Sequence, residues 1–284
     1  MKRIASLALL IAFGIAAYAQ KEAPKPNINK ALALARQGKY DEAKAIVDAV
    51  PTHEKSKIDD KSWFFRGIVY VAMDTSSAYN TTGENYSAVA AEAFAKASEL
   101  AGPKGKLSIM DTNSGATQTL PDLIKYFNNI FLYKGDKLFG QEKFSEAIVQ
   151  FRKGLALSPD TAIFRYAGYA AHNGNQSDQT IEFLTKYLDN GGTNSQALFL
   201  WVGSIYEYKK DFELALAATP RAMTINPNEQ NYRQIELNCL IELKRYQEAA
   251  DNLQGTIAKN PKDTETLYLL GALNEELGKP DQAK

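Results

Sequence analysis

Apolar side chains in this chain recur three to four positions apart, which is the spacing of one buried face of an α-helix. Phe164, Ala167, Gly168 and Ala171 show this spacing, and we expect them to pack inward from a single helix. Polar side chains fill most of the positions between them. The pattern predicts a protein that consists of amphipathic helices.

The helical pattern itself repeats about every 34 residues. The phrase Gln-Glu-Lys-Phe-Ser-Glu-Ala at 141–147 recurs four times, and its last residue, Ala147, aligns with Thr180, Ala215, Ala249 and Ala283 at separations of 33, 35, 34 and 34 positions. Two less regular copies precede it, within 38–43 and 63–97. One helix pair cannot bury its apolar face alone, so stacked pairs must supply the core. We therefore expect an all-α array of about six repeats and a partial seventh over 30–284, after a flexible segment at 20–29.

Each copy also carries small residues and helix terminators at fixed places. The first helix has glycine at 135, 168, 203 and 271 and the apolar Leu237 at the same place in one copy, and the terminators after the second helix are Pro159, Gly192, Pro227 and Pro261. Pro cannot continue a helix and Gly accepts a left-handed cap, so both types end helices. Small residues such as Gly168 and Gly203 are expected to let paired helices approach closely. Aromatic residues such as Phe151, Phe199 and Tyr206 are expected to fill the space between neighbouring repeats.

One copy matches a known 34-residue pattern with particular regularity. Its matching residues are Phe199, Val202, Gly203 and Tyr206, followed by Ala215, Thr219, Ala222 and Pro227. In these residues the chain resembles the tetratricopeptide repeat family. The resemblance implies a right-handed α-solenoid of antiparallel helix pairs. It also implies a scaffold for protein–protein interaction, with the ligand on the concave face lined by the first helix of each pair.

Residues on that face should lie off the inward stripe, at the spacing i, i+4, i+7. This offset gives the candidate groove residues Asp136, Arg165, Tyr169, His172, Ser204, Glu207, Asn231, Gln234, Asn238 and Tyr268. Amide, hydroxyl, guanidinium and aromatic groups together suit a peptide backbone. We therefore expect a peptide or a partner protein as the ligand.

The same offset gives an apolar strip in the second and third repeats, with Phe64, Ile68 and Val71 in the second and Leu132 and Phe139 beside Asp136 in the third. Two interpretations stay open. The strip binds apolar side chains of a partner, because exposed apolar patches usually mark interaction sites, or the 103–120 loop or the first repeat folds over it. We favour the second interpretation.

Three features depart from the repeat. Insertions lie near 74–84 and at 103–120, and the stretch Asp111-Thr-Asn-Ser-Gly within the second is interpreted as a turn at the tip of a short hairpin. Pro220 lies inside a predicted second helix. Because Pro has no N–H to donate to the preceding turn, we expect this helix to bend.

The first residues differ in composition from the rest of the chain. Lys2 and Arg3 precede an apolar run over 4–17, and Ala17-Tyr18-Ala19 is a typical cleavage pattern. The run is shorter than the roughly 18 residues that a spanning helix needs, so it predicts a signal peptide at 1–19. No later segment is long and apolar enough to span a membrane. We therefore expect an exported protein, periplasmic or secreted.

Charge and motif content argue against other classes of function. Lys plus Arg equals Asp plus Glu at 33 each, whereas a nucleic-acid binder needs an excess of basic charge on one face. His53, His172 and Cys239 are too few soft ligands for a structural zinc site, and the inward position of Cys239 predicts a buried, inert thiol. No catalytic or phosphate-binding motif is complete. We therefore predict no catalytic residue, no cofactor and no metal.

These observations predict a non-enzymatic scaffold or adaptor of the bacterial cell envelope that binds a peptide or partner protein in its groove. The alternative is a structural subunit that self-associates, or caps a larger assembly, through its repeat ends. A homo-oligomer is compatible with that alternative.

Overall fold

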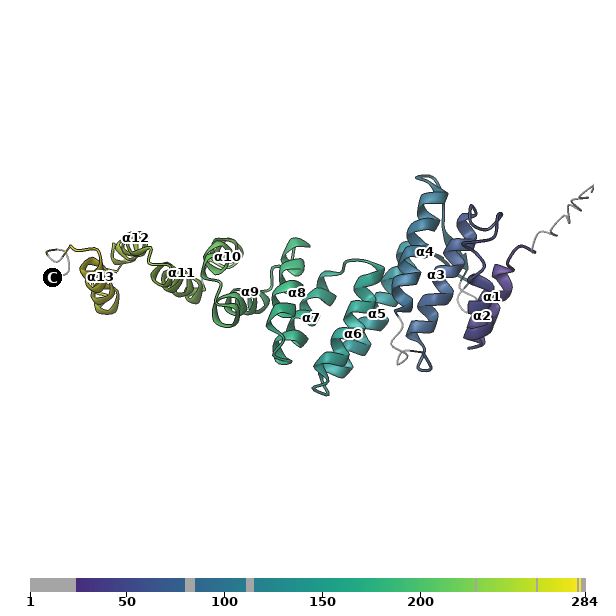
Figure 1. The fold of residues 1–284 in the computed structure, drawn as a ribbon, viewed down its shortest axis with the longest axis horizontal. Helices are drawn as coiled ribbons and strands as arrows, with labels where there is room; N and C mark the ends of the chain where they lie inside the picture. The colour runs from purple at the N-terminus through teal and green to yellow at the C-terminus, as the bar shows by residue number, and fades with distance from the viewer. Residues whose placement is uncertain are drawn as a thin grey trace, which may run out of the picture.

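The computed structural model describes residues 24–79, 85–110, 115–227, 229–258, 260–279 and 281. Within these residues the chain forms an elongated array of helices with one short β-hairpin (Figure 1). The predicted signal peptide at 1–19 lies outside the described residues, as do parts of the predicted segments 20–29 and 74–84. None of the described helices combines the length and apolarity needed to cross a membrane.

The helices alternate between two sets along the array. The first helices of the pairs are α1 (Ile28–Arg36), α3 (Asp60–Thr75), α5 (Leu120–Phe139), α7 (Thr161–Asn173), α9 (Ser195–Gly203), α11 (Gln230–Glu242) and α13 (Thr264–Glu276). The second helices are α2 (Tyr40–Val47), α4 (Tyr86–Ala101), α6 (Phe144–Leu157), α8 (Ser177–Asp189), α10 (Phe212–Ile225) and α12 (Tyr246–Ile257). We call the two sets helix A and helix B. The described residues thus contain six pairs and the first helix of a seventh, which confirms the predicted all-α solenoid.

Each helix A packs against the helix B that follows it, and most B helices pack against the next helix A. In Figure 1, α4 and α6 are seen from the side, whereas α10 and α12 are seen nearly end-on. The helix direction therefore rotates along the array, as in a superhelix.

The recurring phrase forms the turn between helix A and helix B. One residue of the turn is left-handed in each of the later pairs: Glu142, Asn175, Lys210, Lys244 and Gly278. In four of these turns the next N–H bonds back to the last turn of helix A, as from Lys143 to the Leu138 carbonyl; the turn at Lys210, which follows the π-helical η1, is the exception among them. This geometry is a Schellman cap. The sequence repeats here because the same turn must form each time.

Small residues allow the predicted close approach in some pairs but not in all. A Cβ on Gly135 would lie 2.2 Å from the ring of Phe151, and one on Gly168 would lie 2.4 Å from Leu184. At Gly203 a Cβ would meet nothing within 4 Å, so the packing role predicted for Gly203 is wrong.

The predicted packing role of Phe199 is also wrong, because its side chain is 40% exposed. In that repeat α9 continues into a π-helical turn, η1 (Ser204–Lys209). The buried stripe of this repeat keeps the α-helical spacing i, i+3, i+4, i+7, at Leu198, Trp201, Val202 and Ile205. It lies one residue earlier than the predicted stripe, which began at Phe199.

Pro220 lies within α10, which continues to Ile225. Pro220 has no N–H with which to reach the Leu216 carbonyl. The hydroxyl of the buried Thr219 donates to that carbonyl instead, at 3.0 Å. The neighbouring side chain therefore replaces the missing backbone hydrogen bond.

Candidate functional site

The helix-A face is closed along α3. Phe64, Ile68 and Val71 are buried in one apolar cluster, together with residues of α1. Leu107, which precedes the hairpin, belongs to the same cluster, and Ile109 packs against it. The preferred interpretation, burial within the protein, is confirmed for the second-repeat part of the apolar strip. In the third repeat it is wrong, because Leu132 and Phe139 line open pockets.

The insertion at 103–120 contains the predicted hairpin. Strands β1 (Ser108–Met110) and β2 (Thr117–Thr119) are antiparallel, with Ser108 opposite Thr119. The carbonyl of Met110 accepts a hydrogen bond from Arg36 of α1, so the hairpin reaches the first repeat. The predicted turn at its tip, 111–114, lies outside the described residues.

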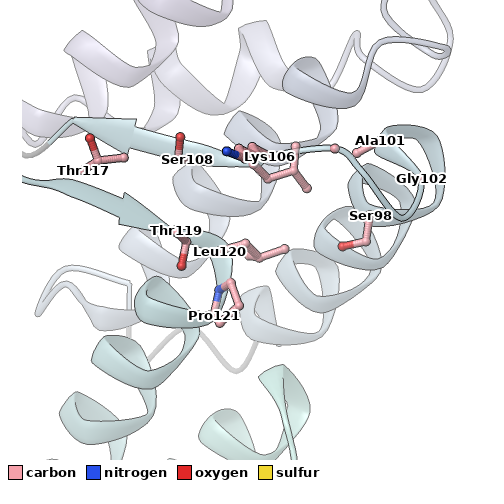
Figure 2. Close-up of a pocket in the computed structure, with 11 residues that line it drawn as sticks. Ser98, Ala101, Gly102, Lys106, Ser108, Thr117, Thr119, Leu120 and Pro121 are labelled. Carbon is pink, nitrogen blue, oxygen red and sulfur yellow. The ribbon is translucent and has the colours of Figure 1, made fainter.

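A pocket of about 610 Å³ lies between the hairpin and the facing ends of α4 and α5. Figure 2 shows Ser98 of α4 and Leu120 of α5 on opposite sides of this space, with Lys106 on the hairpin side. The sequence predicted no site here, because a long loop gives no periodic signal that places its side chains.

A buried ion pair joins the second repeat to the third. Asp74 is fully buried, and its carboxylate accepts from Lys153 of α6 at 2.5 Å and from the Ser87 backbone and hydroxyl at 2.8 and 2.7 Å. Lys134 of α5 donates to the Thr75 carbonyl at 2.7 Å. Burial lowers the pKa of Lys134, and the neighbouring charge of Lys153 lowers it further. These contacts fix the end of α3 against α5 and α6.

Beyond α3 the helix-A face is open and hollowed. A pocket of about 230 Å³ lies between α5 and α7, and we call it the α5–α7 pocket. Its lining residues are Asn129, Leu132, Tyr133, Asp136 and Tyr166. The four α5 residues have the spacing i, i+3, i+4, i+7, so α5 presents one continuous stripe to this pocket.

A second pocket of about 330 Å³, the α7–α9 pocket, lies farther along the same face. Its lining residues are Phe139, Tyr169, His172, Asn173, Gln196 and Leu200. The rings of Tyr166 and Tyr169 meet edge-on, with centroids 6.3 Å apart. Since each ring lines a different pocket, the pair connects the two.

The structure thus brings together three of the predicted groove residues, Asp136, Tyr169 and His172. Tyr169 also has a structural role, because its hydroxyl donates to Asn194, the N-cap of α9, at 2.9 Å. Arg165 is half-buried, with its guanidinium stacked 5.2 Å from the centre of the Tyr166 ring. Arg165 therefore borders the α5–α7 pocket.

Other predicted groove residues lie elsewhere. Ser204 is only 2% exposed, so its predicted place on the groove surface is wrong. It lies three residues after the buried Trp201 and seven after the buried Ala197, on the inward side of the helix. Glu207 is exposed on η1 but lines neither pocket.

The predicted residues of α11 and α13 lie farther along the array. Asn231 and Gln234 are exposed, and the Gln234 amide donates to Asn238 at 2.9 Å. Tyr268 of α13 is 78% exposed. None of these residues lines either pocket.

Sequence reasoning missed several lining residues. Tyr133, Asn129, Tyr166, Asn173 and Gln196 line the pockets but were not predicted. Asn129 and Tyr133 lie seven and three positions before Asp136, so the same helical spacing contains the signal for both. A wider stripe on each helix A would have found them.

The period of 33 to 35 residues, the Schellman turn of the recurring phrase and the glycine contacts in successive pairs are now all established. The fold is an α-solenoid of helix pairs that resembles an array of tetratricopeptide repeats. No protein-family model matches the chain, and no curated protein matches it in sequence.

Among solved structures, the chain is similar to the crystal structure of MamA protein, at 20% identity, with 55% of this chain and 85% of that chain covered and a TM-score of 0.44. It is also similar to YrrB, described as a TPR protein with an unusual peptide-binding site, at 16% identity, with 58% of this chain and 87% of that chain covered and a TM-score of 0.44.

Proposed function

We propose that this protein is a non-enzymatic scaffold or adaptor that binds an extended segment of a partner protein along the helix-A face of α5, α7 and α9. The observation that carries the proposal is the pair of adjoining pockets on this face. Solenoids commonly use their extended concave surfaces for binding. Helix A lines the usual ligand face in tetratricopeptide repeats, and both pockets lie there.

The chemistry of the pockets suits a peptide. Asn129, Asn173 and Gln196 carry amides that both donate and accept hydrogen bonds, as an extended backbone requires. Tyr133 and Tyr169 offer ring surface that loses little conformational entropy on binding, which is why tyrosine is frequent at binding surfaces. A peptide can therefore bury apolar side chains between the rings and bond its backbone to the amides.

We place this function in the bacterial cell envelope, in the periplasm or outside the cell, because residues 1–19 have the pattern of a cleaved signal. Mass spectrometry of protein recovered from an expressing bacterium tests this location. A mature chain that begins at Gln20 supports it, and an intact N-terminus on protein in the cytoplasm contradicts it.

The binding proposal is tested by panning a random peptide library on the chain from Gln20 and measuring the affinity of the selected peptides. We expect Tyr133→Ala to abolish binding. Tyr208→Ala is the matched control, because Tyr208 is also an exposed tyrosine but lies at a different pocket, beside Asn175 and Lys209. Failure to select any peptide, or equal loss in the two variants, contradicts the proposal.

A further inference from the structure

One group in the α5–α7 pocket carries a formal charge. Asp136 is exposed there, and no cation of the described residues pairs with it. Tyr133, one turn earlier on α5, is 69% exposed and lines the same pocket. A carboxylate and an accessible aromatic ring therefore share one small hollow.

This combination favours a cation. The face of an aromatic ring attracts ammonium and guanidinium groups, and a carboxylate forms a charge-assisted hydrogen bond with either. Leu132 and the two tyrosine rings offer apolar surface to the aliphatic stem that carries such a group. Asn129 adds an amide oxygen that can accept a further hydrogen bond.

The structure already contains one cation against this wall. The guanidinium of Arg165 stacks on Tyr166, which shows that the tyrosine ring accommodates a positive group. Arg165 is also a competing charge at the border of the pocket. A ligand cation is therefore best placed on the α5 side, against Tyr133 and Asp136 and away from Arg165.

The α7–α9 pocket differs in chemistry. Phe139 and Leu200 supply apolar walls there, and the lining contains no carboxylate. An apolar side chain loses water-exposed area in this pocket, whereas a cation finds no opposite charge among the lining residues.

We propose that the partner segment carries a Lys or Arg side chain that binds in the α5–α7 pocket and an apolar side chain that binds in the α7–α9 pocket. This inference rests on the proposed peptide-binding function and names the residue types that the groove selects. The occupant of the α5–α7 pocket is a basic side chain of a peptide rather than a free cation. One peptide backbone can carry both this side chain and a second, apolar side chain that enters the α7–α9 pocket.

The test is an oriented peptide library presented to the chain from Gln20, with each residue type fixed in turn at one position. We expect Lys and Arg to be enriched about tenfold over Asp and Glu at one position, because a tenfold ratio corresponds to only about 1.4 kcal/mol. Asp136→Asn should abolish this preference and Asp136→Lys should reverse it toward Asp and Glu. Glu207→Gln is the matched control, since Glu207 is exposed on η1, which continues α9, but lies outside both pockets.

The outcomes separate this inference from the proposed function. Peptides that bind in a Tyr133-dependent way without a basic preference, or with a preference that survives in Asp136→Asn, overturn the inference and leave the function intact. A library from which no peptide is selected overturns both. If free arginine bound as tightly as the peptide and displaced it, the pocket would be assigned to a free cation. That result would also overturn the inference.

Discussion

The second repeat and the three that follow present the same face of helix A in two different states. On α3 this face is buried with α1 and with Leu107 and Ile109 of the insertion. On α5, α7 and α9 it is hollowed into two pockets. One repeat pattern thus supplies both a closed surface and an open, hollowed surface.

The repeat period therefore does not determine which residues of helix A are exposed to solvent. The period fixes which residues of helix A point away from its partner helix. Whether another segment then covers them depends on insertions, which have no period. Polarity at these positions is not a sufficient guide, because α5 carries the apolar Leu132 and Phe139 on either side of Asp136, and both line open pockets.

The largest expected effect comes from removing an aromatic ring from the closed face of α3 and, for comparison, from the open face of α5. Phe64→Ala should destabilise the protein by about 3–5 kcal/mol, as buried phenylalanines do. Tyr133→Ala should change stability by less than about 0.5 kcal/mol, because the ring is exposed, yet abolish peptide binding. Urea unfolding and peptide titration measure the two quantities. Similar losses of stability in both variants would contradict the claim that this face is buried on α3 and open on α5.

A smaller effect distinguishes glycines that look equivalent in sequence. Gly135→Ala should be destabilising, because overpacking against Phe151 costs about 1–3 kcal/mol and outweighs the roughly 1 kcal/mol that alanine gains inside a helix. Gly203→Ala should stabilise by about 0.5–1 kcal/mol, since its Cβ meets nothing. Thermal unfolding of both variants checks the sign. A loss of stability in Gly203→Ala would mean that this glycine has a packing role after all.

The Thr219 hydroxyl should contribute about 1 kcal/mol, because it satisfies the carbonyl that Pro220 leaves without a backbone donor. Thr219→Val removes that contribution. In a Pro220→Ala background the same change should cost less, because the introduced alanine can donate its own N–H to the Leu216 carbonyl. A double-mutant cycle in urea gives the coupling energy between the two positions. If the free-energy changes of the two single variants simply add, the Thr219 hydroxyl does not replace the N–H that Pro220 lacks.

The smallest effect concerns Cys239, which is fully buried on α11 next to Asn238. Burial first, and the charges of Glu236 and Glu242 after it, raise the pKa of Cys239 to about 11. The thiol should therefore stay protonated at pH 8 and react with a disulfide reagent only on unfolding. Rapid reaction of the native protein would show that α11 does not keep the inward register of α7.

Periodicity made much of this fold predictable from the sequence. The recurring phrase marks the left-handed turn in each later pair, and Gly135 and Gly168 mark real close contacts. Prediction failed in α9, where the inward stripe lies one residue earlier than predicted. The stripe of α9 follows that of α7 by 34 residues, as Phe164 and Leu198 show, whereas the turn residues Thr180 and Ala215 lie 35 apart. Alignment on the turn therefore placed the stripe one residue too late, which wrongly buried Phe199 and wrongly exposed Ser204.

The candidate site was only partly predictable for a related reason. Asp136, Tyr169 and His172 lie at predicted positions, yet a pocket also needs side chains from neighbouring helices at particular distances. Tyr166 and Gln196 enter the pockets from α7 and α9, and their placement depends on how successive repeats stack. The pocket beside the hairpin depends on an insertion whose path the repeat does not encode.

Amide hydrogen exchange with and without a selected peptide tests most directly whether the helix-A face of α5, α7 and α9 is the binding surface. We predict slower exchange in α5, α7 and α9 when the peptide is bound and no change in α3, whose helix-A face is already closed. Protection on α3, or protection confined to helix B or to α11 and α13, would contradict the assignment of the open face as the binding surface.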